Sequence, residues 1–273
     1  MKISTFPIAV ISAFLLLVSA AAAQDNALLD EAEDLFAQEK FVEAGKLFRK
    51  LVEQDSKDFN ANFKLGLCEL TQRNYSDAVV MLTAASELEG DPQHEVYFYR
   101  AFSYWRLDKN EQALADYTHA IEIKPDYIDA FNNRAQVYEQ QENHRAAIQD
   151  YQSALAIDST NPGLWYNVGR LFAGIGNCRE AVQAFNTALQ YRPDYPEVLM
   201  QRGNCHLLLK LLDRSLADFK QLAELQPDNA EALGKLGYCQ ALAGDKETGC
   251  ANLHRATELG FSGAADMSAD VCK

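Results

Sequence analysis

A pattern with a period of 34 residues runs through almost the whole chain and strongly limits how it can fold. Small residues recur at Gly169, Gly203 and Gly237, and the same phase continues upstream, with one step of 35 between Gly66 and Ala101. A second small position and a large apolar position recur in step with the first. A repeat of this length predicts an array of similar units, each of which buries its apolar face by stacking on its neighbours.

Each unit is predicted to be a helix hairpin. It contains two stretches with apolar residues at helical spacing, separated by a short polar turn such as Asp108-Lys109-Asn110. The small residues are expected where two helices cross, because a missing side chain lets the helix axes approach. The aromatic residues of the third position are expected to fill the space beside them.

The pattern resembles that of the tetratricopeptide repeat (TPR) family, which has this period. The stretch 162–195 matches the family's aromatic, small and proline positions best, at Trp165, Gly169, Phe172, Ala181, Phe185, Ala188 and Pro193. The resemblance implies an all-α fold, a right-handed superhelix (α-solenoid) of seven hairpins and a C-terminal capping helix. The expected repeats are 25–58, 59–93, 94–127, 128–161, 162–195, 196–229 and 230–263, and the capping helix is 264–273.

The repeats also show a covariation between two positions. Repeats with Arg at the seventh position carry Asp sixteen residues later, whereas the repeat with Val168 at that position lacks the Asp. The pairs are Arg100 with Asp116, Arg134 with Asp150, and Arg202 with Asp218. We expect these pairs to join the two helices of one repeat, so their arginines should not contact a ligand. Removing one member of a partly buried pair leaves the other charge uncompensated.

The first 23 residues have the features of a secretory signal peptide. Lys2 precedes an apolar core at 8–18, and a run of small residues at 19–23 ends before Gln24. Cleavage is expected after Ala23, which predicts a mature protein in a periplasm or outside the cell, with no membrane insertion after cleavage. The alternative is an uncleaved anchor, although the apolar core is short for a membrane span.

The charge of the chain argues against two classes of partner. The formal net charge is -14, and loss of Lys2 with residues 1–23 makes it -15. Nucleic acids and anionic membranes are bound through Lys and Arg that neutralise phosphate charge. An acidic chain therefore predicts neither partner, and its charge serves solubility or the attraction of a basic partner.

Six cysteines in an exported chain raise the question of disulfides. Across an antiparallel hairpin, two residues face each other when they are equally distant from the turn. This favours Cys250 with Cys272, which would fasten the capping helix, and Cys178 with Cys205, while Cys239 with Cys250 is a competing pair. Cys68 and Cys239 stand at a position that resembles the family's small buried position, and the resemblance implies free thiols packed as small apolar residues.

No motif in the chain predicts catalysis or a cofactor. It contains no glycine-rich phosphate loop, nucleophile elbow or zinc-protease motif. The best candidate metal ligands are Cys250, His254 and Cys272, but the closely spaced ligand pairs of known zinc sites are absent. We therefore expect a protein that is not an enzyme and that holds no metal or other cofactor.

The resemblance implies that the first helix of each hairpin lines a concave groove. In the family, its second, fifth, sixth, ninth, twelfth and thirteenth positions point into that groove. Applied here, this predicts an aromatic zone and an amide-rich zone. The predicted groove residues are Lys64, Phe98, Tyr99, Trp105, Asn132, Asn133, Gln136, Tyr166, Asn167, Arg170, Gln201, Asn204, Lys235 and Tyr238, with Phe63 and Phe102 as further aromatic members.

These residue types suit a protein or peptide partner. A side-chain amide both donates and accepts, so a ladder of amides can pair with the backbone of an extended or C-terminal peptide. Arg170 or Lys235 would then meet a carboxylate. The alternatives are that the amides only solvate a helix face while the aromatic residues pack, or that the protein is a structural or assembly subunit that uses its convex face or its termini.

Overall fold

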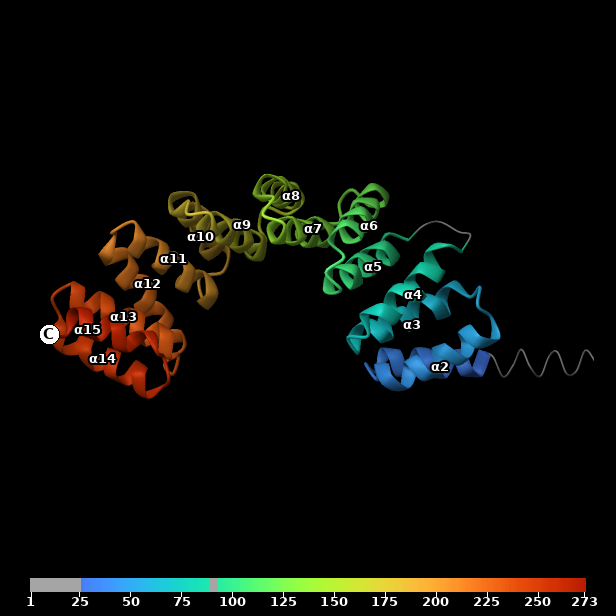
Figure 1. The fold of residues 1–273 in the computed structure, drawn as a ribbon, viewed down its shortest axis with the longest axis horizontal. Coiled ribbons are helices and arrows are strands. Elements are labelled where there is room, and N and C mark those ends of the chain that lie inside the picture. Colours follow the sequence, from blue (N-terminus) through green and yellow to red (C-terminus); the bar gives the residue numbers. More distant parts are fainter. Residues whose placement is uncertain (1–25, 89–92) are drawn as a thin grey trace, which may run out of the picture. The chain divides into compact units, whose positions relative to one another are not determined.

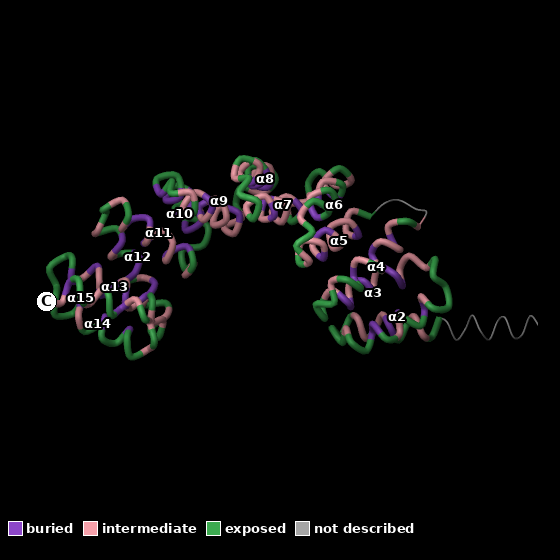
Figure 2. Tube along the Cα trace, viewed as in Figure 1, coloured by how far each residue is buried: buried purple, intermediate pink, exposed green. Residues whose placement is uncertain are grey.

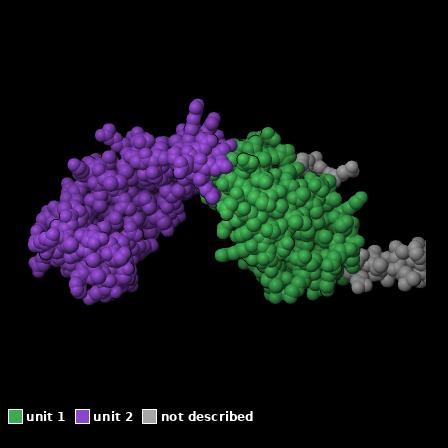
Figure 3. Space-filling view, in the orientation of Figure 1, with its two compact units in different colours: residues 1–137 green, residues 138–273 purple. Residues whose placement is uncertain are grey.

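The computed structural model describes residues 26–88 and 93–273, and within them every regular element is an α-helix (Figure 1). The chain forms two compact units, Met1–Val137 and Tyr138–Lys273, and the boundary falls within one helix, α7 (Figure 3). The predicted signal peptide, 1–23, lies outside the described residues. So do residues 89–92, which belong to the segment that carries the additional residue between the second and third repeats.

The first unit consists of helix hairpins joined by short turns. Its first helix covers 26–37 of the described residues. The helices that follow are α2 (Phe41–Gln54), α3 (Phe59–Thr71), α4 (Tyr75–Ser86), α5 (His94–Arg106), α6 (Asn110–Ile123) and most of α7 (Ile128–Gln140). The helices α3, α5 and α7 begin at residues 59, 94 and 128, which are also the first residues of the expected repeats.

The second unit continues the same arrangement after the end of α7. Its helices are α8 (His144–Ile157), α9 (Pro162–Gly174), α10 (Cys178–Tyr191), α11 (Pro196–Leu208), α12 (Leu212–Leu225), α13 (Ala230–Leu242), α14 (Lys246–Glu258) and α15 (Gly263–Val271). The helix hairpins predicted from the repeat pattern and the all-α fold implied by the family resemblance are therefore confirmed. No helix among residues 26–88 and 93–273 is both long and apolar enough to cross a membrane.

The helices begin and end where the sequence provides local signals. Asn161 accepts hydrogen bonds from the first turn of α9, which starts with Pro162, and Asn229 caps α13 in the same way. Within each hairpin, the turn contains one residue with positive φ. These residues are Glu39, Arg73, Asp108, Glu142, Gly176, Lys210 and Gly244, so the same left-handed turn recurs with the repeat.

The core lies where the helices of a hairpin face each other (Figure 2). Phe185 is fully buried, and a Cβ added to Gly169 would lie 2.4 Å from its ring. Gly203 faces the buried Phe219 in the same way, at 2.8 Å. The repeated small positions thus exist because a large side chain of the second helix occupies the space.

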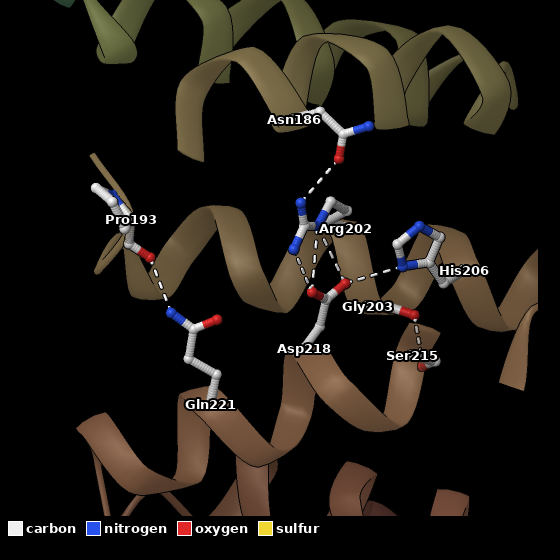
Figure 4. A network of polar contacts seen from close by, with 8 residues as sticks. All are labelled: Asn186, Pro193, Arg202, Gly203, His206, Ser215, Asp218 and Gln221. Carbon is white, nitrogen blue, oxygen red and sulfur yellow. Dashed lines mark hydrogen bonds and ion pairs between the residues drawn. The ribbon is translucent and has the colours of Figure 1, made fainter. Parts of the chain in front are cut away.

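Two of the predicted Arg–Asp pairs are confirmed. Arg100 Nε and Nη2 donate to Asp116 at 2.7 and 2.8 Å, and Arg202 donates to both carboxylate oxygens of Asp218. Each arginine also reaches the preceding repeat: Arg202 Nη1 donates to Asn186 at 2.8 Å (Figure 4). One side chain therefore connects three helices. Arg134 and Asp150 belong to different units, and their pairing stays a prediction.

The predicted C-terminal fastening agrees with the geometry. The Cα atoms of Cys250 and Cys272 are 5.9 Å apart and their sulfur atoms are within bonding distance. Ala264 and Val271 of α15 are buried against Leu253 of α14. The predicted bond between Cys178 and Cys205 is not formed in the structure, where both are buried thiols, and Cys68 and Cys239 are buried thiols as expected.

Candidate functional site

The predicted groove residues are all half-buried, but many of them already have partners within the chain. Lys64 donates to Glu33 at 3.1 Å, and its ammonium lies 4.2 Å from the ring centre of Phe36. Its charge is therefore used inside the first unit, in an ion pair and a cation–π contact. Its place in the groove stays a prediction, and a partner that uses the ammonium would have to compete with these contacts.

The aromatic zone of the first unit is largely a packed cluster. Phe98 lies 5.2 Å from Tyr99 and 4.9 Å from Tyr127, measured between ring centres, and Trp105 makes an edge contact with Phe102 at 5.9 Å. Burial raises the pKa of Tyr99, and the nearby Glu95 and Asp129 act in the same direction. The predicted alternative, that these rings pack against one another, describes most of their contacts.

The amides of the first unit are likewise partly engaged. Asn132 Nδ2 lies 3.4 Å from Asn133 Oδ1, and Gln136 is half-buried one turn further along α7. The predicted ladder from Asn133 to Asn167 and Gln201 would run from one unit to the other, and it stays a prediction. Asn167, in the second unit, also takes part in an interaction of its own.

The second unit contains two neighbouring hollows on α9 and α11. The first, the Tyr166 hollow, has a volume of about 230 Å³ and is lined by Tyr166, Pro196, Glu197, Met200, Gln201, Leu222, Gln226 and Asn229. The second, the Leu208 hollow, has a volume of about 300 Å³ and is lined by Arg170, Ala173, Gly174, Cys178, Gln201, Asn204, Cys205 and Leu208. Gln201 lines both, so the two hollows meet at this side chain.

The chemistry of the Leu208 hollow suits an extended polypeptide. Within the residues that the structure describes, the side-chain amides of Gln201 and Asn204 have no hydrogen-bond partner, and each can donate and accept. Leu208 is 74% exposed, and a Cβ added to Gly174 would have nothing within 4 Å. The hollow thus combines two available amides with an apolar edge and free space.

Arg170 cannot serve as the predicted carboxylate receptor without breaking a contact. Its Nη2 donates to both carboxylate oxygens of Glu139 at 2.9 Å, and Glu139 also accepts from the Tyr151 hydroxyl. Burial raises the pKa of Tyr151, and the hydrogen bond to Glu139 adds to this. The guanidinium is thus already paired with a carboxylate of its own chain, at the edge of the Leu208 hollow.

The remaining predicted residues lie near the C-terminus of the second unit. The Tyr238 hydroxyl donates to Asp270 Oδ2 at 2.8 Å, and this bond is the main cause that raises the pKa of Tyr238. Tyr238 therefore holds α15 against α13. Lys235 is half-buried one turn before Cys239, and its charge lowers the thiol pKa that burial raises.

Sequence reasoning missed several residues of the two hollows. Ala173, Gly174 and Leu208 occupy the twelfth and thirteenth positions of their repeats, and Met200 occupies the fifth. These positions are expected to face the groove, but their small or aliphatic side chains carry no polar or aromatic group that would indicate binding. The missed signal is the absence of bulk at Ala173 and Gly174, which creates the space.

The described residues show no arrangement that would hold a metal ion. No group of three His, Cys, Asp or Glu side chains is close enough within 26–88 and 93–273. Of the three candidate ligands, Cys250 and Cys272 face each other, while the exposed His254 lies 3.5 Å from Glu258.

Comparison with known families agrees with the repeat pattern. Models of the tetratricopeptide repeat match residues 29–93, 166–221 and 211–248, a further one matches 128–161, and a TPR repeat model matches 103–142. More than half of the chain is matched. The chain belongs to the tetratricopeptide repeat family, whose fold is typical of protein-interaction scaffolds.

Individual relatives are distant. The chain is 33% identical over 82 residues to the tetratricopeptide repeat domain-containing protein PYG7, chloroplastic, of Arabidopsis thaliana, which is 29% of this chain and 27% of that protein. The chain therefore spans about a quarter of this relative's length.

Solved structures show the fold over a longer stretch. The C-terminal part of a TPR repeat-containing protein from Cytophaga hutchinsonii has a TM-score of 0.75 at 16% identity, covering 87% of this chain and 98% of that one. YrrB, described as a TPR protein with an unusual peptide-binding site, has a TM-score of 0.56 at 20% identity, covering 82% and 97%. At these identities the likeness is one of fold.

Proposed function

We propose that this protein is an exported, noncatalytic adaptor that binds an extended segment of a partner protein on α9 and α11. The observation that carries the proposal is Gln201, which lines both hollows of the second unit and whose amide has no hydrogen-bond partner among the described residues. A segment crossing this side chain would lie along both hollows. Backbone groups of an extended chain need such partners once they leave water.

The two hollows differ in what they offer a bound segment. The Tyr166 hollow contains Tyr166, Pro196 and Met200, which suit an apolar side chain, and Glu197 at its edge suits a basic one. The Leu208 hollow contributes the amide of Asn204 beside the exposed Leu208. We infer a segment with an apolar residue and a basic residue, since the only guanidinium lining these hollows, that of Arg170, is paired with Glu139.

Export is supported by the features of residues 1–23, and the acidic charge of the chain agrees with a basic segment. In an exported protein, the groups that face each other at Cys250 and Cys272 would be oxidised to a disulfide. Labelling of the N-terminus of the protein recovered from its native host, with residue 24 as the first residue, would establish cleavage after Ala23.

The binding proposal is tested by selecting peptides from a displayed random library on the purified protein and measuring their affinity by fluorescence anisotropy. The variant Gln201→Ala with Asn204→Ala should weaken a selected peptide about tenfold or more, because each lost hydrogen bond contributes about 1 kcal/mol. The matched control is Gln183→Ala with Gln190→Ala, which removes two exposed amides of α10.

Two outcomes would decide against this site. Equal loss in both double variants would show a general effect of removing amides. Peptides that bind all three proteins equally would place the binding surface elsewhere, and an assembly subunit that uses its convex face or termini would then be the better description.

A further inference from the structure

Two buried thiols line the Leu208 hollow, and we call this part of its lining the floor. Cys178 is the first residue of α10, and Cys205 lies in the last two turns of α11, so the α10–α11 turn brings them together. Both belong to the same buried cluster and both line the hollow, so the two thiols lie close to each other. Nothing in the proposed peptide site uses this pair.

The other two thiols of the structure have different surroundings. Cys239 lies 3.6 Å from the Ser215 hydroxyl, and Cys68 is fully buried beside Gly45. Neither contacts another cysteine among the described residues. The chain therefore contains an internal comparison: one pair of adjacent thiols and two isolated ones, all buried.

The hollow also gives access to one sulfur of the pair. Cys178 is 6% exposed and Cys205 is 2% exposed, and beside them the space at Gly174 is open. Burial raises the pKa of the Cys205 thiol to about 12, and the contact with Cys178 adds to this. Cys178 is therefore the more exposed residue of the pair, and we take its thiol as the first to react.

We propose that Cys178 and Cys205 are a redox pair that a disulfide oxidant converts to a disulfide at the floor of the hollow. The Cys178 thiolate attacks one sulfur of the oxidant, which forms a mixed disulfide and releases the oxidant's other sulfur as a thiolate. Cys205 then loses its proton and attacks the sulfur of Cys178, which releases the second thiol of the oxidant. Two protein thiols are oxidised, one disulfide is reduced to two thiols, and the two protons pass to the released thiolates.

The bond would change the hollow as well as the core. It would fix the start of α10 to α11 and close a loop across the α10–α11 turn, which restricts the unfolded chain. Because both sulfurs line the Leu208 hollow, its floor would exist in two covalent states. This chemistry does not depend on the proposed peptide site, and the test below involves no peptide.

The test starts from fully reduced protein, freed of reductant and incubated with glutathione disulfide. Remaining thiols are then alkylated under denaturing conditions and the protein is mapped by mass spectrometry. We expect a linked peptide that contains Cys178 and Cys205, with Cys68 and Cys239 alkylated. The proposal is overturned if both Cys178 and Cys205 are alkylated while Cys250 and Cys272 are linked, or if either cysteine pairs elsewhere.

Two serine variants examine the order of the steps. Cys205→Ser should retain glutathione on Cys178, because the second attack is lost, whereas Cys178→Ser should leave Cys205 unmodified. Glutathione on Cys205 in the second variant would contradict the assigned order. Circular dichroism of each variant checks its fold, and the mapping of the unaltered protein stands without them. Oxidation should also raise the Tm of the unaltered protein by more than that of Cys205→Ser.

Discussion

The α10–α11 and α8–α9 junctions occupy the same place in successive repeats but are held together differently. At α10–α11, the guanidinium of Arg202 donates back to Asn186 and forward to Asp218, which is 2% exposed (Figure 4). Asp218 also accepts from the buried His206, at 2.9 Å. A single charged side chain thus connects α10, α11 and α12, and we call this arrangement of an arginine with its partners the clamp.

At α8–α9 the residue that corresponds to Arg202 is Val168. The residues that correspond to Asn186 and Asp218 are Gln152 and Ala184. A hollow of about 380 Å³ lies here, lined by Ile148, Gln152, Leu155, Ala156, Trp165, Val168 and Phe172. The arginine position therefore does more than form an ion pair within a repeat. It fills the junction with the preceding repeat, and a shorter apolar residue leaves that space unfilled.

Removing the carboxylate at the clamped junction should have the largest effect. Asp218→Ala leaves the Arg202 guanidinium without its buried counter-charge and removes the partner of His206. We expect the free energy of unfolding to fall by about 3–5 kcal/mol, measured by chemical denaturation. Glu224→Ala, which removes an exposed carboxylate from the same helix, is the control. Similar small losses in both variants would mean that the network contributes little.

Building the clamp into the open junction should have an intermediate effect. Val168→Arg or Ala184→Asp alone introduces an unpaired charge and should destabilise the second unit. Together they recreate the Arg–Asp spacing, so we expect a coupling energy of about 2 kcal/mol in a double-mutant cycle of unfolding free energies. Additive single effects would show that the backbone of the α9–α10 hairpin holds the two positions too far apart.

The two junctions should also differ in how they contribute to the pH dependence of stability, because His206 belongs to the α10–α11 junction. Burial lowers the pKa of His206 from its ordinary value of 6.5, Asp218 opposes this, and Arg202 and Arg214 reinforce it. The unfolded chain therefore binds this proton more readily, so the contribution of neutral His206 is present above pH 6.5 and is lost as the pH falls below it.

Replacing His206 removes that titration while leaving the rest of the network. The unfolding free energy of His206→Gln, measured between pH 5 and pH 7.5, should fall less steeply with acid than that of the unaltered protein. The hydrogen-bond partners of Arg100 among the described residues are Asp116, Thr83 and Ser86, so this clamp contains no His and should not contribute in this pH range. A steeper fall in the variant would mean that protonation of His206 stabilises the folded chain, which is the opposite of the expected effect.

Features that depend on spacing within one repeat could be predicted from the sequence. The hairpins, the pairs of Arg100 with Asp116 and of Arg202 with Asp218, and the approach of Cys250 to Cys272 all follow from distances counted along the chain. The helical turn makes such distances equivalent to directions in space, which is why a single sequence with internal repeats is informative.

Features that depend on side chains from different positions of the repeat could not be predicted in this way. Arg170 meets Glu139, which lies 31 residues earlier and three positions later in its own repeat, so no repeat-to-repeat comparison indicates the pair. The Leu208 hollow arises where Ala173 and Gly174 leave space, and the volume between helices is set by backbone positions. A periodic pattern shows which face a residue occupies, whereas its partner depends on packing.

The smallest expected effect concerns the turns that close the two hairpins. Gly176 between α9 and α10 has φ 83°, and Lys210 between α11 and α12 has φ 60°, a left-handed conformation that costs residues with a Cβ. Lys210→Gly should therefore raise the unfolding free energy by about 0.5 kcal/mol, the relief of this cost less the greater freedom of glycine in the unfolded chain. Gly176→Lys should lower it by a similar or larger amount. If both substitutions destabilise, contacts of the Lys210 side chain outweigh the backbone preference, and the two turns differ in more than their φ angles.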